Sequence, residues 1–409
     1  MARYLDVYLH SDLVGSLEQD DHGDLGFQYA LAWLDRPNAV ALSLSLPLRA
    51  EPFSHRECRP FFAGLLPEEH QRSLLAEAFR ISERNDFSLL DKIGGECAGA
   101  VSLMPPGQQP ELSTQVSKPL TLEELAEKLA ALPKKPLLAG DQGLRLSLAG
   151  AQSKMAVIVR NGAYALPVQG TPSSHILKPQ SPRFDHLVEN EFFCMRLAAL
   201  AGLKVAEVQL GEAGGARFLQ ITRYDRESLA DGRLRRLHQE DFCQALGCVP
   251  EQKYQQEGGP GLRQCFELIR SVSSAPALDV LHLLDAVVFN ALIGNGDAHG
   301  KNFSLVHRAG TLRLAPLYDL ICTQAYPELD QRFAMKIGKH REPDRIGRED
   351  WLAFLSETHL GVAPAKRRML NLIATVEALL ERGLDSGNDQ EAIKSCIRAN
   401  AVRLRHALQ

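Results

Sequence analysis

The sequence predicts an α+β fold in which a small β-rich domain precedes a two-lobed body. The chain has 409 residues, more than one hydrophobic core usually fills, so two or three packed units are expected. Short strand-like runs dominate up to about residue 226, whereas helical periodicity dominates from Gln239 onward. Hydrophobic residues make up 45% and charged residues 23%, which argues against wholesale disorder.

The first domain is expected over residues 1–105. Four segments read as short strands: 3–9, 14–17, 27–29 and 41–46. After Pro47, residues 57–93 show the apolar spacing of helices, and residues 100–103 read as a closing strand. This order predicts a small β-rich domain.

A linker and a β-rich lobe follow. The segment 105–110 is rich in proline and glycine, which predicts a linker over residues 106–120. Thr121 opens a helix with capping-box chemistry, and that helix ends near Leu132. In the lobe over residues 121–226, a helix is expected at 187–201 and strands at 145–148, 155–160, 175–178, 206–210 and 217–223.

Helices dominate the last part of the chain, residues 227–409. Apolar residues from 277 to 293 lie close to the i, i+3, i+4, i+7 rule, which predicts a mostly buried helix that stops at Gly294. The runs 303–307 and 311–315 read as a hairpin. Further helices are expected at 349–382 and 389–408. The segment after Gly294 is therefore a loop, and the hairpin returns the chain to it.

This loop contains the oxygen ligands that phosphoryl transfer requires. Asp297 and Asn302 lie five positions apart, and Asp319 follows the hairpin. Protein kinases use an Asp to orient the attacking hydroxyl, and an Asn five residues later and a second Asp to hold Mg²⁺. The spacing alone is common, and capping of backbone amides by Asp297 and Asn302 is the alternative. Together the three residues favour a protein-kinase-like fold with a nucleotide lobe and an all-α C-terminal lobe.

Net charge, cysteine spacing and the lack of long apolar runs argue against a nucleic-acid-binding, zinc-binding or membrane protein. The formal net charge is −4, so no overall positive field draws the chain to nucleic acid. Two basic clusters, at 233–236 and 366–368, are most simply solvated faces. The eight cysteines lack paired spacing, which disfavours a zinc site, and neither a signal peptide nor an apolar run of about 18 residues is evident. A cytoplasmic protein with free, buried thiols and no membrane association is expected.

Nine segments in a fixed order carry a family pattern: 43–47, 62–67, 146–154, 171–179, 188–191, 240–247, 258–261, 294–304 and 318–319. Together they resemble the HipA family, the kinase toxins of bacterial type II toxin–antitoxin pairs. The resemblance spans nearly the whole chain. It includes a small first domain that some relatives carry as a separate chain and that is fused here.

The resemblance assigns roles within the phosphoryl-transfer loop. It makes Asp297 the catalytic base and Asn302 and Asp319 the Mg²⁺ ligands. It also implies that His299 and Lys301 face the phosphates or the substrate hydroxyl.

Lys178 lies in an apolar strand, where an ammonium group is costly unless it is paired. By resemblance to kinases it contacts the ATP phosphates and is held by a carboxylate on the following helix. Glu191 is the expected partner and Glu189 the second choice. A lysine that extends from the strand end into water is the alternative.

The loop over residues 148–154 is the family's phosphate-binding element. Its members here are Ala149, Gly150, Ala151, Gln152, Ser153 and Lys154. Small side chains let backbone amides approach phosphate oxygens, although a tight turn without a ligand is the alternative. Ser153 stands where some relatives carry Glu. In the family Ser147 is an autophosphorylation site, and about two added negative charges there would repel ATP. An ordinary strand serine is the alternative.

The segment around Arg223 is expected to be the hinge that meets the nucleotide. The resemblance implies adenine contacts by the backbone near Thr222 and Tyr224, and a ribose contact by Asp225. Thr222 replaces an acidic residue of some relatives, a change that a backbone contact would survive. Ion pairing of Asp225 with Arg223 or Arg226 is the alternative.

The resemblance implies an ATP- and Mg²⁺-dependent serine/threonine protein kinase that arrests growth by phosphorylating an aminoacyl-tRNA synthetase, the glutamyl enzyme being the best known. A HipB-like helix-turn-helix antitoxin would inhibit the kinase and recruit it to operator DNA, which agrees with a net charge of −4. Two alternatives stay open: a small-molecule kinase of the aminoglycoside-phosphotransferase type, and a catalytically idle corepressor.

Overall fold

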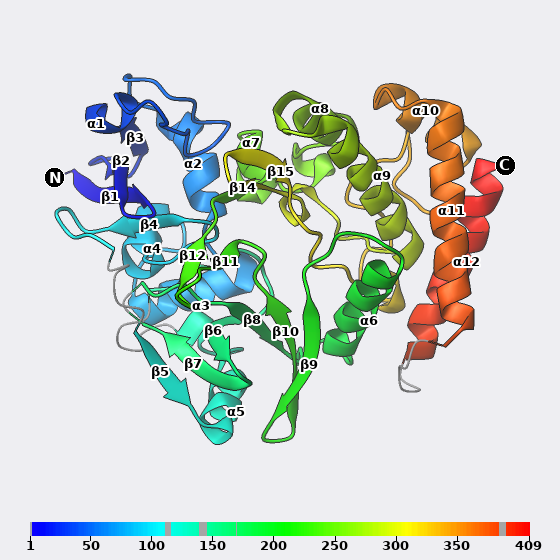
Figure 1. The fold of residues 1–409 in the computed structure, drawn as a ribbon, viewed down its shortest axis with the longest axis horizontal. Coiled ribbons are helices and arrows are strands. Elements are labelled where there is room, and N and C mark those ends of the chain that lie inside the picture. The colour runs from blue at the N-terminus through cyan, green and yellow to red at the C-terminus, as the bar shows by residue number, and fades with distance from the viewer. Residues whose placement is uncertain (1, 111–115, 139–144, 169, 384–389) are drawn as a thin grey trace. The chain divides into compact units, whose positions relative to one another are not determined.

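The computed structural model describes residues 2–110, 116–138, 145–168, 170–383 and 390–409. The chain divides into two units: Met1–Pro182 with Gly211–Pro250, and Arg183–Leu210 with Glu251–Gln409. Both sheets and helices are present, which confirms the α+β prediction (Figure 1). Residues 111–115 of the predicted linker and residue 389 of the predicted last helix lie outside the described residues.

The first unit begins with a four-stranded antiparallel sheet (Figure 1). The strand predictions at 3–9, 14–17 and 27–29 are confirmed. Residues 41–46 instead form turns, because Ser43 and Leu46 fold back onto each other in a single bridge. The strand order is β3 (Leu25–Tyr29), β2 (Asp12–Gln19), β1 (Arg3–Leu9) and β4 (Val101–Met104).

Helices pack against this sheet and close an aromatic core. The predicted helical stretch contains α2 (His55–Gly64), α3 (Glu69–Phe79) and α4 (Asp86–Ile93), and a short α1 (Leu31–Leu34) precedes them. Phe27, Phe53 and Phe62 are each at most 2% exposed, and the ring centroids of Phe27 and Phe62 are 5.3 Å apart. Burial of such large rings provides much of the hydrophobic stabilisation of this domain.

The first unit also contains a six-stranded sheet, apart from residues 208–210 of its last strand. Helix α5 (Leu122–Ala131) packs against this sheet. Thr121 is its N-cap, and the Thr121 hydroxyl accepts a hydrogen bond from the amide of Glu124, as the capping-box prediction requires. The strand order is β5 (Ser117–Leu120), β7 (Ala163–Pro167), β6 (Met155–Arg160), β8 (His175–Pro179), β10 (Ala216–Thr222) and β9 (Val208–Ala213).

Two local expectations for this part of the chain differ from the structure. Strand β5 lies inside the predicted linker, because residues 117–120 pair with β7. The strand expected at 145–148 does not form. Instead Leu146 makes a single bridge to Glu96, and the Ser147 amide donates to the Glu96 carbonyl at 2.8 Å. This segment therefore pairs with the first domain rather than with the six-stranded sheet.

Residues 226–245 belong to the first unit rather than to the helical lobe in which the sequence placed most of them. A buried carboxylate explains the attachment: Glu240 accepts hydrogen bonds from the Ser43 hydroxyl at 2.5 Å and from the Leu44 amide at 3.1 Å. The Ser45 hydroxyl also donates to the Gln244 carbonyl at 2.8 Å. The elements here are β11 (Arg226–Ser228), β12 (Leu234–Arg236), β13 (Gln239–Asp241) and α7 (Phe242–Ala245).

The second unit is built around helix α9 (Pro276–Ile293), which confirms the predicted buried helix. This helix has the length and mean hydropathy of a membrane span, and 67% of it is buried inside the protein. The predicted tail helices form as well, and the first is split before Gly361. Helices α8 (Leu262–Val272), α11 (Val362–Glu381) and α12 (Glu391–Leu408) pack against α9, and α10 (Arg348–Glu357) packs against these three.

The second unit also holds α6 (Leu187–Leu200), which the sequence assigned to the nucleotide lobe. The side chain of Asn190 explains this placement. Its oxygen accepts from the Cys322 amide at 2.8 Å, and its nitrogen donates to the Cys322 carbonyl at 3.0 Å. The expected hairpin is present as β14 (Ser304–Arg308) and β15 (Thr311–Leu314).

All eight cysteines are free, and six of them are buried, as expected for a protein without disulfides. Burial raises the pKa of the Cys58 and Cys97 thiols to about 12. These thiols are therefore neutral packing groups at physiological pH.

The buried Glu240 makes the stability of the first unit depend on pH. Burial raises the pKa of Glu240 to about 7, although the Ser43 and Leu44 hydrogen bonds oppose that shift. Because the folded pKa lies above the unfolded value, the folded state keeps a proton that the unfolded chain loses above about pH 4.5. The contribution is complete below that pH and is lost as the pH rises through about 7, a change of about 3 kcal/mol.

We expect Glu240→Gln to flatten the pH dependence of unfolding between pH 5 and pH 8, because the amide stays neutral. Denaturant midpoints at several pH values measure this, and the comparison is between slopes rather than absolute stabilities. An unchanged slope in the variant would show that Glu240 is ionised in the folded protein.

Candidate functional site

The loop after α9 is fixed at its start by backbone geometry. Helix α9 ends at Gly294, whose φ of +67° is the left-handed conformation that glycine adopts without strain. The Thr323 hydroxyl donates to the Gly294 carbonyl at 3.0 Å and accepts from the Gly296 amide at 2.7 Å. A Cβ at Gly296 would lie 2.8 Å from the Arg332 carbonyl oxygen. The chain therefore enters the predicted catalytic segment along one defined path.

Asn295 connects the two predicted acidic residues, and the sequence analysis did not single it out. Its oxygen accepts from the Asp297 amide at 3.1 Å, and its nitrogen donates to the Asp319 carbonyl at 3.3 Å. The same nitrogen donates to the Asn290 side chain at 2.8 Å, and Asn295 is 2% exposed. A buried polar residue between two glycines was the available signal, because such a group must be hydrogen-bonded.

The side chain of Asp297 is 55% exposed. Its Oδ1 accepts a hydrogen bond from the Tyr254 hydroxyl and lies 3.8 Å from Nε2 of His299. His299 is 6% exposed and Lys301 8% exposed, so both lie in the wall of the loop rather than on its surface. An exposed carboxylate on a loop whose neighbouring side chains are buried can accept a proton from an incoming hydroxyl.

A tyrosine links the two segments that carry the predicted metal ligands. The Tyr318 hydroxyl donates to the carbonyl of Lys301 at 2.7 Å, which links the residue before Asp319 to the residue before Asn302. Asn302 Oδ1 also accepts from the His299 amide at 3.1 Å, so part of the capping alternative holds. A carbonyl-type oxygen retains a second lone pair after one hydrogen bond.

The chemistry of this pair suits a hard divalent cation. One amide oxygen and one carboxylate are the donors that Mg²⁺ takes from proteins, with phosphates and water completing its shell. Asp319 has a φ of +53°, a conformation that Asp and Asn adopt more readily than most residues. Within the described residues there is no group of three His, Cys, Asp or Glu side chains that could hold a metal ion.

The predicted phosphate loop is held against the first domain. Ser147 is fully buried, and its hydroxyl donates to the Leu65 carbonyl at 2.6 Å. The Glu68 amide donates to the Gly150 carbonyl at 3.3 Å. The Gln71 side chain donates to the Ser153 hydroxyl at 3.2 Å. Three points of attachment therefore fix this loop to α3 and the turn before it.

The centre of the loop has the conformation that a small residue permits. Gly150 has a φ of +104°, and a Cβ there would lie 2.8 Å from Lys154 Nζ. That ammonium group donates to the Ala149 carbonyl at 2.6 Å. A positive charge is thus placed across the turn formed by Ala149, Gly150 and Ala151, with Gln152 next in the chain.

Lys178 lies on β8 opposite Leu219 of β10 and is 3% exposed, so it does not extend into solvent. The solvent-exposed alternative is therefore excluded. The candidate partners Glu189 and Glu191 lie on α6 in the second unit and are 6% and 1% exposed. A pairing between Lys178 and either glutamate stays a prediction.

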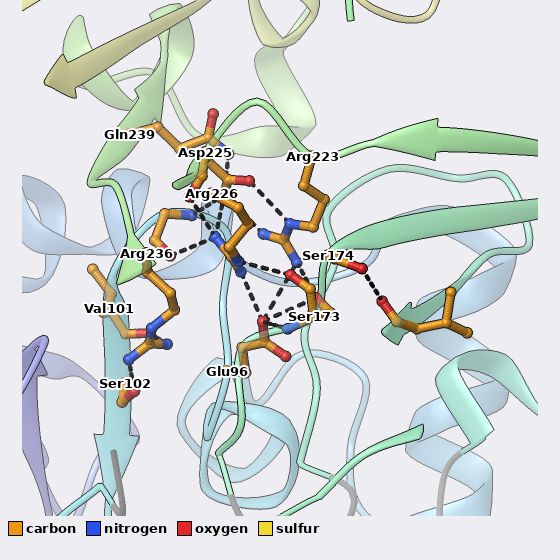
Figure 2. A network of polar contacts seen from close by, with 12 residues as sticks. Glu96, Val101, Ser102, Ser173, Ser174, Arg223, Asp225, Arg226, Arg236 and Gln239 are labelled. Carbon is orange, nitrogen blue, oxygen red and sulfur yellow. Dashed lines mark hydrogen bonds and ion pairs between the residues drawn. The ribbon is translucent and has the colours of Figure 1, made fainter. Parts of the chain in front are cut away.

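The hinge segment contains a buried network of ion pairs (Figure 2). Asp225 is 2% exposed and accepts from Arg223 Nε at 2.9 Å and Nη2 at 2.8 Å. Arg226 Nη1 lies 2.9 Å from Oδ2, the oxygen that also accepts from Arg223 Nη2, and the Gly99 amide donates to the same oxygen at 2.8 Å. The ion-paired alternative thus describes Asp225, and its oxygens face arginines rather than a ribose.

Glu96 completes this network from the first domain. It accepts from Arg226 Nη2 at 2.7 Å and from the Ser173 amide at 2.9 Å, as Figure 2 shows. Burial alone would raise the pKa of both carboxyls, but Arg223 and Arg226 hold the pKa of Glu96 and of Asp225 below the ordinary range. Both carboxylates are therefore ionised in the folded protein.

Thr222 and Tyr224 flank this network and are partly exposed. Thr222 ends β10 opposite His175, and the Arg223 amide donates to the Ser174 carbonyl at 3.0 Å. The Tyr224 hydroxyl donates to the Gln239 side chain. The buried arginines thus fix the backbone of the segment that was predicted to meet adenine.

The chain is similar to known proteins over nearly its whole length. The family model described as HipA-like C-terminal domain matches residues 146–382, and the HipA N-terminal domain matches residues 5–104. A Sinorhizobium fredii protein named "Putative kinase Y4mE" is 51% identical over 392 residues, which cover 95% of this chain and 93% of the relative. The serine/threonine-protein kinase toxin HipA of Shewanella oneidensis is 32% identical, over 86% of this chain and 82% of its own.

A solved structure extends the likeness to the fold. The Shewanella oneidensis HipA chain, in a complex with HipB and operator DNA, matches with a TM-score of 0.82 and 27% identity. The match covers 99% of this chain and 97% of that one. This likeness confirms the prediction of a kinase-like fold. The chain therefore belongs to the HipA family of serine/threonine kinase toxins.

Proposed function

We propose that this chain is an ATP- and Mg²⁺-dependent protein kinase that transfers a γ-phosphoryl group to serine or threonine. The observation that carries the proposal is the exposed Asp297 carboxylate on a loop that buried side chains hold in place. Hydrogen bonds of Asn295 connect Asp297 with Asp319, and the Tyr318 hydroxyl links the residue before Asp319 to the residue before Asn302. Membership of a kinase family and a kinase-like fold support it.

In this proposal each residue of the loop has a separate task. Asp297 orients the attacking hydroxyl and accepts its proton. Asn302 and Asp319 would hold Mg²⁺, which neutralises charge on the phosphates. His299 and Lys301 line the loop and would contribute positive charge or hydrogen bonds near the transferred group.

The first unit would supply the nucleotide contacts. Residues 149–154 would offer backbone amides and the Lys154 ammonium group to the phosphates. Lys178 would contact phosphate. The backbone at Thr222 and Tyr224 would meet adenine. Asp225 is not carried forward as a ribose ligand, because its oxygens are occupied by Arg223, Arg226 and Gly99.

We assign Ser147 as the autophosphorylation site on the basis of family membership. Its burial gives the modification a clear physical consequence. A phosphate cannot replace a hydroxyl that is fully buried and bonded to the Leu65 carbonyl, because two charges would lose their hydration. Phosphorylation would therefore drive the loop out of its present position and remove phosphate-binding amides.

The family relationship also supports the partners. The Shewanella oneidensis relative was solved with HipB and operator DNA, and we assign a HipB-like antitoxin to this chain, with operator DNA bound mainly through it. The protein substrate would be an aminoacyl-tRNA synthetase of the glutamyl type, whose modification blocks translation and arrests growth. We place the chain in the cytoplasm, where that substrate lies.

Asp297→Asn should abolish phosphoryl transfer while ATP binding remains. A positioned base contributes roughly a hundredfold or more to rate, and an amide cannot accept the proton. Incubation with labelled ATP and Mg²⁺ measures transfer, and calorimetry measures ATP affinity. Asp344→Asn, at an exposed position of the same unit, is the control that should retain activity. A wild-type rate in Asp297→Asn would refute the role of the base.

Asp319→Asn should weaken ATP binding in the presence of Mg²⁺ and leave metal-free binding unchanged. Asn removes the charge but tolerates the left-handed conformation at φ +53°, whereas Asp319→Ala adds backbone strain to the loss of the ligand. Calorimetry with ATP, with and without Mg²⁺, separates the two effects. Equal losses under both conditions would argue against a metal ligand at this position.

Ser147→Asp should lower ATP affinity and expose the segment 145–154 to protease, because a carboxylate cannot stay in the buried site. Ser147→Ala is the matched control. It loses one hydrogen bond, worth about 1 kcal/mol, and should keep the loop in place. Wild-type ATP affinity and protease resistance in Ser147→Asp would contradict the proposed effect of phosphorylation.

A further inference from the structure

The segment 258–261 belongs to the family pattern but has no role in the site described so far. It closes a loop that carries Tyr254, and its glycines have a steric reason. A Cβ at Gly259 would lie 2.2 Å from the Gln252 carbonyl oxygen and 2.7 Å from that of Lys253. The Tyr254 carbonyl accepts from the amides of Glu257 at 2.9 Å and Gly259 at 3.0 Å. The backbone at Tyr254 is thereby fixed.

Side-chain contacts hold the same loop within the second unit. The Gln255 side chain accepts from the Lys336 amide at 2.7 Å. The Gly261 amide donates to the Gln264 side chain at 2.9 Å where α8 begins. Tyr254 is therefore presented from a rigid support rather than from a freely moving loop.

The phenol of Tyr254 reaches the proposed base. Its hydroxyl donates to Asp297 Oδ1, and its ring packs edge-on against the His299 ring with centroids 4.9 Å apart and planes at 83°. Nε2 of His299 lies 3.8 Å from the same oxygen. Both contacts fall on Oδ1, so they define the orientation of the carboxylate and direct Oδ2 away from the tyrosine.

We propose that Tyr254 is a positioning residue that fixes the Asp297 carboxylate so that Oδ2 receives the substrate hydroxyl. This inference rests on the proposed function of Asp297 as the base. A carboxylate that is 55% exposed would otherwise rotate about its side-chain bonds, and transfer requires one orientation within hydrogen-bond reach of the hydroxyl. The hydroxyl of Tyr254 carries this role, whereas its ring supports the loop.

Tyr254→Phe tests the inference because it keeps the ring and removes only the donor. We expect kcat to fall by about tenfold, the effect of losing one hydrogen bond to a charged group. KM for ATP and the melting temperature should stay at the wild-type values, because the tyrosine contacts the base rather than the nucleotide. The measurements are initial rates with labelled ATP and Mg²⁺, together with thermal unfolding.

Tyr4→Phe is the matched control. The Tyr4 hydroxyl donates to the Glu18 carboxylate at 3.0 Å on an exposed face of the first sheet, so the same kind of bond is removed far from the loop in sequence. This variant should keep the wild-type kcat.

Three results would overturn the inference, and they differ from one another. A wild-type kcat in Tyr254→Phe, with Asp297→Asn inactive, would remove the role of Tyr254 and leave the proposed function intact. A raised KM for ATP with unchanged kcat would make Tyr254 a nucleotide-binding residue instead. Absence of transfer by the wild-type protein itself would remove the proposed function and the inference together.

Discussion

The second unit depends on the buried side chain of Asn295. It forms hydrogen bonds with the Asp297 amide, the Asn290 side chain and the Asp319 carbonyl. One hydrogen-bond network therefore holds both the segment that carries Asp297 and the segment that carries Asp319. Left without partners, the amide of a buried asparagine would destabilise the fold by roughly 1–3 kcal/mol, so the hydrogen bonds of this network form cooperatively. The backbone of the loop can therefore keep one conformation although the side chain of Asp297 is exposed.

In the first unit, a network of buried ion pairs has the same stabilising role. Glu96 and Asp225 are buried opposite Arg223 and Arg226, and removing any one of them would leave an unpaired buried charge (Figure 2). This network joins the first domain to the hinge segment. The fused first domain is thus a structural part of the proposed nucleotide site, because the hinge backbone takes its position from Glu96 and Gly99.

Periodic segments were predictable from the sequence, and contacts between distant segments were not. The apolar spacing of residues 277–293 specified α9, since a buried helix needs little beyond its own pattern. The segment 145–148 has the alternation of a short strand, but it makes only a single bridge to Glu96, a choice of partner that no local pattern encodes. The resemblance implied a ribose contact for Asp225, and ion pairing with Arg223 or Arg226 was the alternative. The neighbouring arginines made that pairing readable from the sequence, but the contacts of the network with Gly99 and Glu96 join segments more than 120 positions apart. Tyr254 was missed because its partner lies 43 positions away.

We expect Asn302 and Asp319 to hold the metal beside an exposed Asp297. A crystal structure with Mg²⁺ and a non-hydrolysable ATP analogue tests it most directly. We expect Mg²⁺ at about 2.1 Å from the Asn302 amide oxygen and from an Asp319 carboxylate oxygen, with the γ-phosphate facing Asp297. A metal bound elsewhere, or a γ-phosphate turned away from Asp297, would contradict it.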